Sequence, residues 1–253
     1  QRHATSKIKS FEDLMELETM GFRGEALPSI SSVSIIETSS HYYEEETAVF
    51  IRLEGGKEVI FEETARDIGT TIKVKNMFYN TPARKKFLRQ ASTEKRHILN
   101  ELNIQALAHP EISFKFISDQ KEVFHYFPCL KLEERIIQIF GDSIENELLP
   151  IHYDSQLGKI NGFAGTPEAA RKNSMIFSFI NQRFVKDKII TKAILEIYRS
   201  MLEKNLYPFV ILNLQINPQR VDFNVHPTKR EVRFEQSHSI YQMVHSAIKK
   251  SLD

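Results

Sequence analysis

Short strand-like segments joined by tight turns recur along this chain. Residues 47–53 and 58–62 flank Gly55-Gly56, a pair that favours a hairpin turn. Residues 70–75 alternate polar and apolar side chains, as a half-buried strand does. A second hairpin is indicated within residues 114–127, around Asp119-Gln120. Because helical patterns separate these strands, we expect an α+β fold.

The helices are indicated by their end signals. Ser10 is placed to cap a short amphipathic helix, and a second helix is expected from Glu25, because Pro28 is tolerated only in a first turn. Thr81-Pro82 has the pattern of another helix start. Pro128 marks the predicted boundary between two α+β domains, 1–128 and 129–253. Later elements are expected as helices near 92–107, from 132, over 188–203 and 240–252, and as strands over 148–153, 159–164, 176–180 and 209–216.

The composition excludes several classes of protein. The 253 residues contain 34 Lys and Arg and 33 Asp and Glu, so the formal net charge is +1. That balance excludes a uniformly basic nucleic-acid binder but allows a local basic surface. No apolar run approaches the roughly eighteen residues that a membrane span needs, so we expect no membrane partner. The single cysteine, Cys129, cannot form an internal disulfide, which favours a reducing compartment.

Charge is not evenly distributed. Residues 1–127 carry 17 basic and 19 acidic side chains, and residues 128–253 carry 17 and 14. One basic cluster, Arg183, Lys186, Lys188 and Lys192, surrounds only Asp187. Such a cluster indicates either a solvated surface or a contact for an acidic partner.

A phosphate site is indicated by Gly21-Phe22-Arg23-Gly24-Glu25-Ala26-Leu27. Glycines let the backbone approach a ligand closely, and a helix that starts directly afterwards presents unpaired N–H groups. Thr5-Ser6-Lys7 offers hydroxyl donors and a charge. The alternative is an ordinary glycine-containing turn between helices, since neither the P-loop nor the dinucleotide-binding pattern is matched.

The loop around Pro227 is a second candidate phosphate contact. Lys229 on this rigid loop is placed to reach a phosphate as a point charge, unless it is an ordinary surface lysine. His226 has no second ligand at zinc-like spacing, so we predict no metal site.

These segments together resemble MutL, the DNA mismatch repair ATPase family of the GHKL superfamily. The resemblance runs over essentially the whole chain. The matching residues are Arg2 to Lys7; Gly21 to Leu27 with Ser29-Ile30; Gly69-Thr70-Thr71; Phe78 to Leu88; Asn181 with Arg183; Val221-Asp222; Val225 to Pro227; Lys229; and Glu231 to Phe234.

The resemblance implies the fold and the roles of individual residues. It implies a partial GHKL (Bergerat-type) ATPase α/β sandwich, followed by a ribosomal-protein-like βαβ domain with a left-handed crossover. Lys229 is expected at the γ-phosphate, where it stabilises the charge in catalysis. The other implied nucleotide contacts are Thr5, Ser6 and Lys7 in the lid, Gly21, Phe22, Arg23, Gly24, Glu25, Ala26 and Leu27 around the triphosphate, and Thr70 and Thr71 near adenine. The implied DNA contacts are Arg183, Lys186, Lys188 and Lys159.

The resemblance also implies a function and partners. It implies a bacterial, cytoplasmic repair protein that uses ATP and Mg²⁺, binds DNA without sequence preference, and forms a homodimer. Its implied protein partners are the mismatch-recognition protein MutS and a downstream helicase or nuclease. A gyrase-like or Hsp90-like protein is disfavoured, because Phe78 to Leu88 and Val221 to Phe234 fit MutL specifically.

The family's first ATPase motifs have no match in this sequence. They are a helix carrying a water-activating Glu and a Mg²⁺-binding Asn, and an Asp-x-Gly-x-Gly segment for adenine. Because the sequence starts at Gln1, we expect these 253 residues alone not to turn over ATP. Two hypotheses remain: an ATP-driven repair enzyme, and a non-catalytic DNA-binding module.

Overall fold

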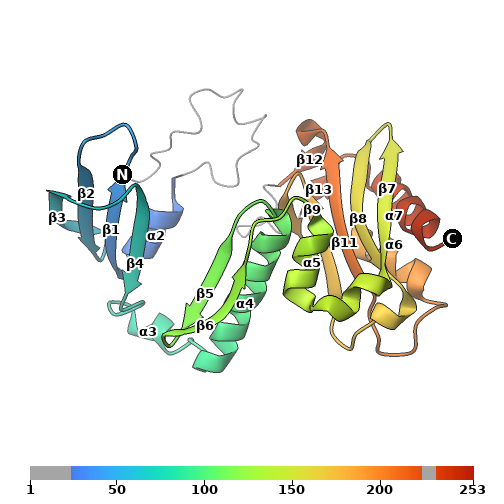
Figure 1. Ribbon diagram of the computed structural model, residues 1–253, viewed down its shortest axis with the longest axis horizontal. Helices are drawn as coiled ribbons and strands as arrows, with labels where there is room; N and C mark the ends of the chain where they lie inside the picture. Colours follow the sequence, from blue (N-terminus) through green and yellow to red (C-terminus); the bar gives the residue numbers. More distant parts are fainter. Residues whose placement is uncertain (1–23, 224–231) are drawn as a thin grey trace. The chain divides into compact units, whose positions relative to one another are not determined.

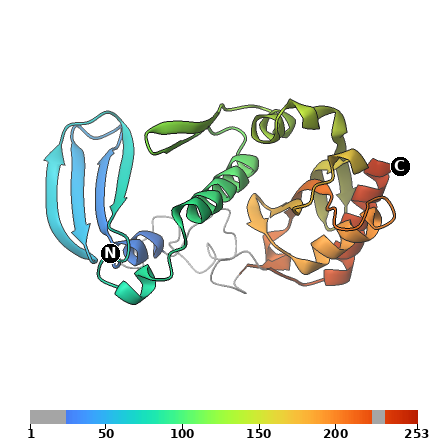
Figure 2. The ribbon, with the colours of Figure 1, turned by 90° about the horizontal axis from the view of Figure 1, so that it is seen from below.

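The computed structural model describes residues 24–223 and 232–253, which divide into two compact units between Lys95 and Arg96. This division falls within α4 (Ala91–Ala108), a single continuous helix in Figure 2. Residues 96–128 join the later unit, because Ile104 and Leu107 of α4 share a hydrophobic core with it. The domain boundary predicted after residue 128 was placed at a proline that follows a strand, and it stays a prediction.

The first unit contains a four-stranded antiparallel sheet (Figure 1). Its spatial order is β3 (Lys57–Thr64), β2 (Ala48–Glu54), β1 (Ile35–His41), β4 (Gly69–Lys75). The predicted Gly55-Gly56 hairpin is confirmed: both glycines have positive φ, 56° and 82°, as this tight turn requires. The short helices α2 (Ala26–Ser31) and α3 (Pro82–Lys85) flank the sheet in the sequence.

One face of this sheet is apolar and open. The register places Phe61 and Ile72 in one row across the sheet, with Val74 on the same face. These side chains are 63%, 45% and 43% exposed. The prediction of a half-buried strand at residues 70–75 is therefore wrong about burial. Its alternation is present, but Ile72 and Val74 are largely exposed, whereas Ile36 on the same face is 2% exposed.

The second unit is built on a mixed five-stranded sheet. Its order is β10 (Arg183–Val185), β9 (Met175–Ile180), β11 (Phe209–Ile216), β8 (Gly158–Gly165), β7 (Leu148–Ser155). The predicted strand–helix–strand unit is present, since β9 and β11 are parallel neighbours on either side of α6 (Lys188–Tyr198) in the sequence. The helix ends five residues before its predicted end, and Asn205, with φ of 69°, lies in the turn toward β11. The left-handedness of the crossover stays a prediction.

Helices cover both faces of this sheet (Figure 1). α6 and α7 (Ser237–Leu252) pack on one face, with Ile190, Ile194 and Val244 fully buried. α4 and α5 (Leu132–Phe140) pack on the other face. The remaining elements are the predicted hairpin β5 (Phe114–Ser118) and β6 (Lys121–Tyr126), the short pair β12 (Val221–Asp222) and β13 (Arg233–Phe234), and 3-10 helices at Asp142–Glu147, Pro167–Ala169 and Pro218–Arg220.

A buried arginine connects α5 to the β5–β6 segment. Arg135 is 0% exposed, and its Nη2 donates to the carbonyl oxygens of Pro110, Ile112 and Phe127 at 2.7, 2.7 and 3.1 Å. Its guanidinium carbon lies 5.7 Å from the ring centroid of Tyr126. Carbonyl oxygens and an aromatic face thus offset part of the cost of burying the charge, while Nε and Nη1 are buried without a hydrogen-bond partner among the described residues.

Candidate nucleic-acid interface

The described part of the candidate phosphate motif is a glycine followed by a helix start, and its phosphate role stays a prediction. Gly24 has a positive φ of 58°, and Glu25 occupies the N-cap position of α2 without a side-chain capping bond. Ala26 and Leu27 begin that helix, which confirms the predicted helix start. The other predicted phosphate contacts lie outside the described residues: Thr5, Ser6, Lys7, Gly21, Phe22, Arg23 and Lys229.

Thr70 and Thr71 lie near the start of β4, which pairs with the end of β1. The start of β1, which follows α2 in the sequence, is at the opposite end of the sheet. Thr70 and Thr71 pair with Ser40 and Ser39, whereas Ile35 at the start of β1 pairs with Lys75. The Thr70 Oγ1 and Ser40 Oγ atoms form a hydrogen bond of 2.8 Å. The predicted adenine-side role of these threonines stays a prediction.

Arg183 is half-buried rather than presented fully to solvent. Its guanidinium carbon lies 4.9 Å from the centroid of the Phe223 ring, and burial lowers the pKa of its guanidinium. Arg183 pairs with Ile180, whose side chain is in the core beneath α6 and α7. The guanidinium of Arg183 therefore packs against the Phe223 ring and also carries a positive charge.

Lys159 lies apart from the other predicted DNA contacts. Its neighbour Ile160 is buried on the α6–α7 face, so Lys159 points to the opposite face of the sheet. Its Nζ forms an exposed ion pair with Asp154 Oδ1 at 3.5 Å. The four predicted DNA contacts thus do not share one surface.

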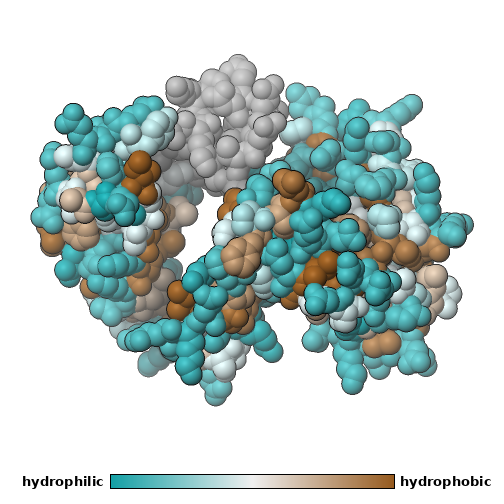
Figure 3. Space-filling view, in the orientation of Figure 1, coloured by the Kyte–Doolittle hydropathy of each residue, from teal (hydrophilic) through white to brown (hydrophobic). Residues whose placement is uncertain are grey.

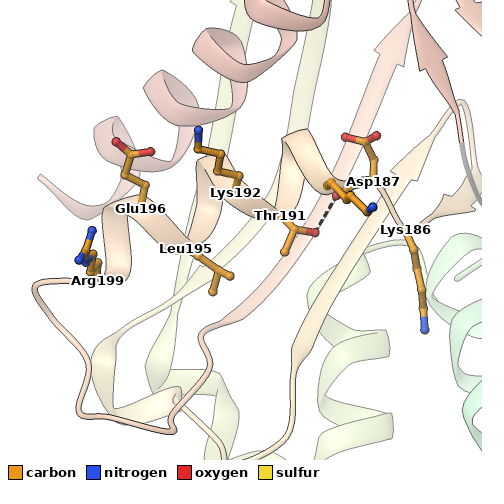
Figure 4. A pocket seen from close by; sticks show the side chains of 8 residues that line it. Lys186, Asp187, Thr191, Lys192, Leu195, Glu196 and Arg199 are labelled. Atoms are coloured by element: carbon orange, nitrogen blue, oxygen red, sulfur yellow. Dashed lines mark hydrogen bonds between the residues drawn. The ribbon is translucent and has the colours of Figure 1, made fainter.

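Lys186 and Lys188 flank the N-cap of α6 in the sequence, and both line a cavity of about 750 Å³, other lining residues of which are shown in Figure 4. Asp187 between them is the N-cap of α6, and its Oδ1 accepts from the N–H groups of Ile189 and Ile190 at 2.8 and 2.9 Å. The cavity is an open groove along α6, lined by Lys186, Asp187, Lys188, Thr191, Lys192, Leu195, Glu196 and Arg199. The sequence cluster at residues 183–192 indicated its first part. Lys192 and Arg199 are seven residues apart, a spacing that places both on one face of a helix, and this was the sequence signal for the rest of the groove.

Other kinds of site are not found in the described residues. Within residues 24–223 and 232–253, no three His, Cys, Asp or Glu side chains lie close enough together to hold a metal ion. The helices of the same ranges include none with the length and hydropathy needed to cross a bilayer. The face shown in Figure 3 is largely hydrophilic, with small separate apolar areas.

Comparison with known proteins shows what the chain is similar to. A family model described as "DNA mismatch repair protein, C-terminal domain" matches residues 136–253. The DNA mismatch repair protein MutL of Christiangramia forsetii is 40% identical over 253 residues, which is all of this chain and 41% of that protein. The chain is homologous to MutL. The MutL protein of Citrifermentans bemidjiense is 41% identical over the same length, and the chain covers 39% of it.

Solved structures share the fold of this chain. The N-terminal domain of a DNA repair protein has a TM-score of 0.77 at 22% identity, covering 99% of this chain and 78% of that one. The Aquifex aeolicus MutL ATPase domain complexed with ADP has a TM-score of 0.64 at 22% identity, covering 93% and 80%. A DNA gyrase B-subunit from Myxococcus xanthus has a TM-score of 0.53 at 12% identity, covering 96% and 77%. The α+β fold and the resemblance to MutL are thus confirmed, while the chain spans about two fifths of the length of its curated relatives.

Proposed function

We propose that this chain acts in DNA mismatch repair as a MutL-type protein. On this proposal, ATP binding and hydrolysis couple mismatch recognition to downstream repair in the cytoplasm. The carrying observation is the 40% identity to a named mismatch repair protein across all 253 residues. A second copy of the protein, MutS, and a downstream helicase or nuclease are its proposed protein partners.

The nucleotide part of the proposal rests on the motif that precedes α2. Gly24 adopts a left-handed conformation directly before a helix start, which is the backbone form that lets N–H groups face a phosphate. Lys229 is proposed to contact the γ-phosphate, so that ATP and ADP differ in the charge they offer it. ATP is the proposed ligand, and Mg²⁺ its expected counter-ion.

For the 253-residue polypeptide by itself, we predict no appreciable ATP turnover. The 253 residues contain no Asp-x-Gly-x-Gly segment and no match to the helix that carries the family's water-activating Glu and Mg²⁺-binding Asn. Phosphoryl transfer without a positioned metal and a water-orienting base loses its main supports. Phosphate release should be measured with and without Mg²⁺, beside a Lys229→Ala variant. Mg²⁺-dependent release that this substitution abolishes would show the prediction to be wrong.

A DNA-binding module is the second candidate function, and the α6 groove favours it. Lys186 and Lys188 are exposed on this groove, and neither forms an ion pair with a described residue. Such lysines bind phosphates without reading bases. The salt slope, taken as the absolute value of the slope of log K against log salt concentration, should fall by about 1.8 when two phosphate contacts are removed, at about 0.9 per contact on duplex DNA.

The test is fluorescence anisotropy with a labelled duplex of arbitrary sequence over a salt series. We expect Lys186→Gln with Lys188→Gln to weaken binding and to lower the salt slope. The control is Lys249→Gln with Lys250→Gln, which removes the same charge from the exposed C-terminal end of α7. If both double variants lost the same DNA affinity, the loss would be explained by the change in net charge alone, and this would contradict the proposed site.

A further inference from the structure

The acids and bases along the α6 groove differ in their partners. Lys186, Lys188, Lys192 and Arg199 are all exposed, and none of them forms an ion pair with a residue in the described ranges. The only acids that line the groove are Asp187 and Glu196. Hydrogen bonds engage both of these carboxylates. The groove therefore carries four positive charges that form no ion pair with a described acid, and two carboxylates whose positions are fixed by hydrogen bonds.

Glu196 is held by a tyrosine on the neighbouring helix. The hydroxyl of Tyr241 on α7 donates to Glu196 Oε2 at 2.6 Å. That hydrogen bond is the main reason that the pKa of Tyr241 is raised, which keeps the hydroxyl protonated as a donor. The Lys192 ammonium lies 5.9 Å from the centre of the same tyrosine ring. Tyr241 thus contacts both Glu196 and Lys192, and these two groove residues do not form an ion pair with each other.

The basic residues of α6 follow one helix face. Lys188 and Lys192 are one turn apart, and Arg199 is about two further turns along, close to the helix C-terminus. At 1.5 Å per residue the three span about 16 Å, which is the length of about five phosphates on one DNA strand. Figure 4 shows the groove side chains spread along α6 rather than gathered at one point.

We propose that Lys192 and Arg199 extend the DNA contact along α6, and that Tyr241 is a positioning residue that binds the Glu196 carboxylate and limits its repulsion of the DNA phosphates. This inference rests on the proposed DNA-binding function and assigns further residues to that surface. The ligand is the phosphate backbone of DNA. Because the groove presents charges along a helix and no enclosed pocket for a base, the contact is independent of sequence.

The first test concerns the length of the contact. Lys192→Gln with Arg199→Gln should lower the salt slope of duplex binding by about 1.8. The Lys249→Gln, Lys250→Gln control should leave the slope nearly unchanged. One outcome is a salt slope that falls in the variant of Lys186 and Lys188 but stays at the control value in the variant of Lys192 and Arg199. In that case Lys192 and Arg199 do not contact DNA, and the proposed DNA-binding function still stands. If neither variant differs from the control, the proposed function fails as well.

The second test concerns Tyr241 and uses a double-mutant cycle. Tyr241→Phe removes the hydroxyl and keeps the ring, so it releases Glu196 toward the groove. An unpaired unit charge about 7 Å from a phosphate costs a factor of about two to three in water, so we expect a rise in Kd of that size. In the Glu196→Gln background the same substitution should have no effect on Kd.

The outcomes of this cycle are distinct. An equal rise in Kd in both backgrounds would show that Tyr241 acts through packing, and would overturn its positioning role. No rise in either background would overturn it too. Circular dichroism of each variant checks the fold, and Glu196→Gln alone is expected to strengthen binding, which an unfolded variant would not do.

Discussion

At the scale of single residues, Gly162 on β8 is the position where an added side-chain methyl group has the clearest consequence for stability. A Cβ built at Gly162 would lie 2.0 Å from the carbonyl oxygen of Ile211 on the neighbouring strand β11. That atom is backbone in the middle of the sheet and cannot move aside cheaply. We predict that Gly162→Ala destabilises the second unit by more than about 3 kcal/mol. Thermal unfolding followed by circular dichroism measures this effect.

Gly141 supplies the control for this prediction. It also has a positive φ, 88°, but a Cβ added there meets nothing within 4 Å. Gly141→Ala should therefore cost only about 1 kcal/mol, from its backbone conformation alone. Similar losses in the two variants would contradict a steric cause at Gly162.

At the scale of elements, α6 depends on the cap at its N-terminus. The Asp187 carboxylate accepts two backbone N–H groups, so Asp187→Ala should destabilise the helix by about 1 kcal/mol. Asp187→Asn keeps a capping oxygen and removes the charge, and its stability should remain close to that of the parent protein. The melting temperatures of the two variants separate the cap from the charge. A destabilised Asn variant would mean that the charge, rather than the cap, holds the helix start.

Elements with a local signal were predictable from the sequence. The hairpins at Gly55-Gly56 and Asp119-Gln120 formed as predicted, because turn residues with positive φ act locally. Strand β1 was missed, because Ile35–His41 ends in Thr, Ser, Ser and His, and its two neighbouring strands stabilise it. Strand β10 was missed because three residues are too few to show a period.

The candidate site was only partly predictable for the same reason. The basic cluster was visible in the sequence, since its members are close along the chain. The hydrogen bond between Tyr241 and Glu196 joins two helices 45 residues apart, and no local pattern indicates it. The buried position of Arg135, which contacts three carbonyl oxygens, likewise depends on tertiary packing.

At the scale of the whole molecule, we expect the exposed apolar side chains on one sheet face of the first unit to affect how the 253-residue polypeptide behaves in solution. Large exposed apolar areas bind other apolar surfaces. Phe61→Lys with Ile72→Lys should therefore lower the fluorescence of a bound hydrophobic dye by about half or more. Tyr43→Lys is the control, because Tyr43 is 66% exposed but lies in the loop between β1 and β2. Equal dye binding in all three proteins would contradict this role of the face.

The edge of that sheet limits the kind of self-association that its face allows. β3 is an outer strand, and it carries Lys57, Glu58, Glu62 and Glu63. Charged side chains on an outer strand disfavour the strand-to-strand addition that builds fibrils. We therefore expect concentrated solutions to form small, reversible, face-to-face oligomers rather than filaments. Dilution in a sedimentation-velocity experiment should return them to monomers.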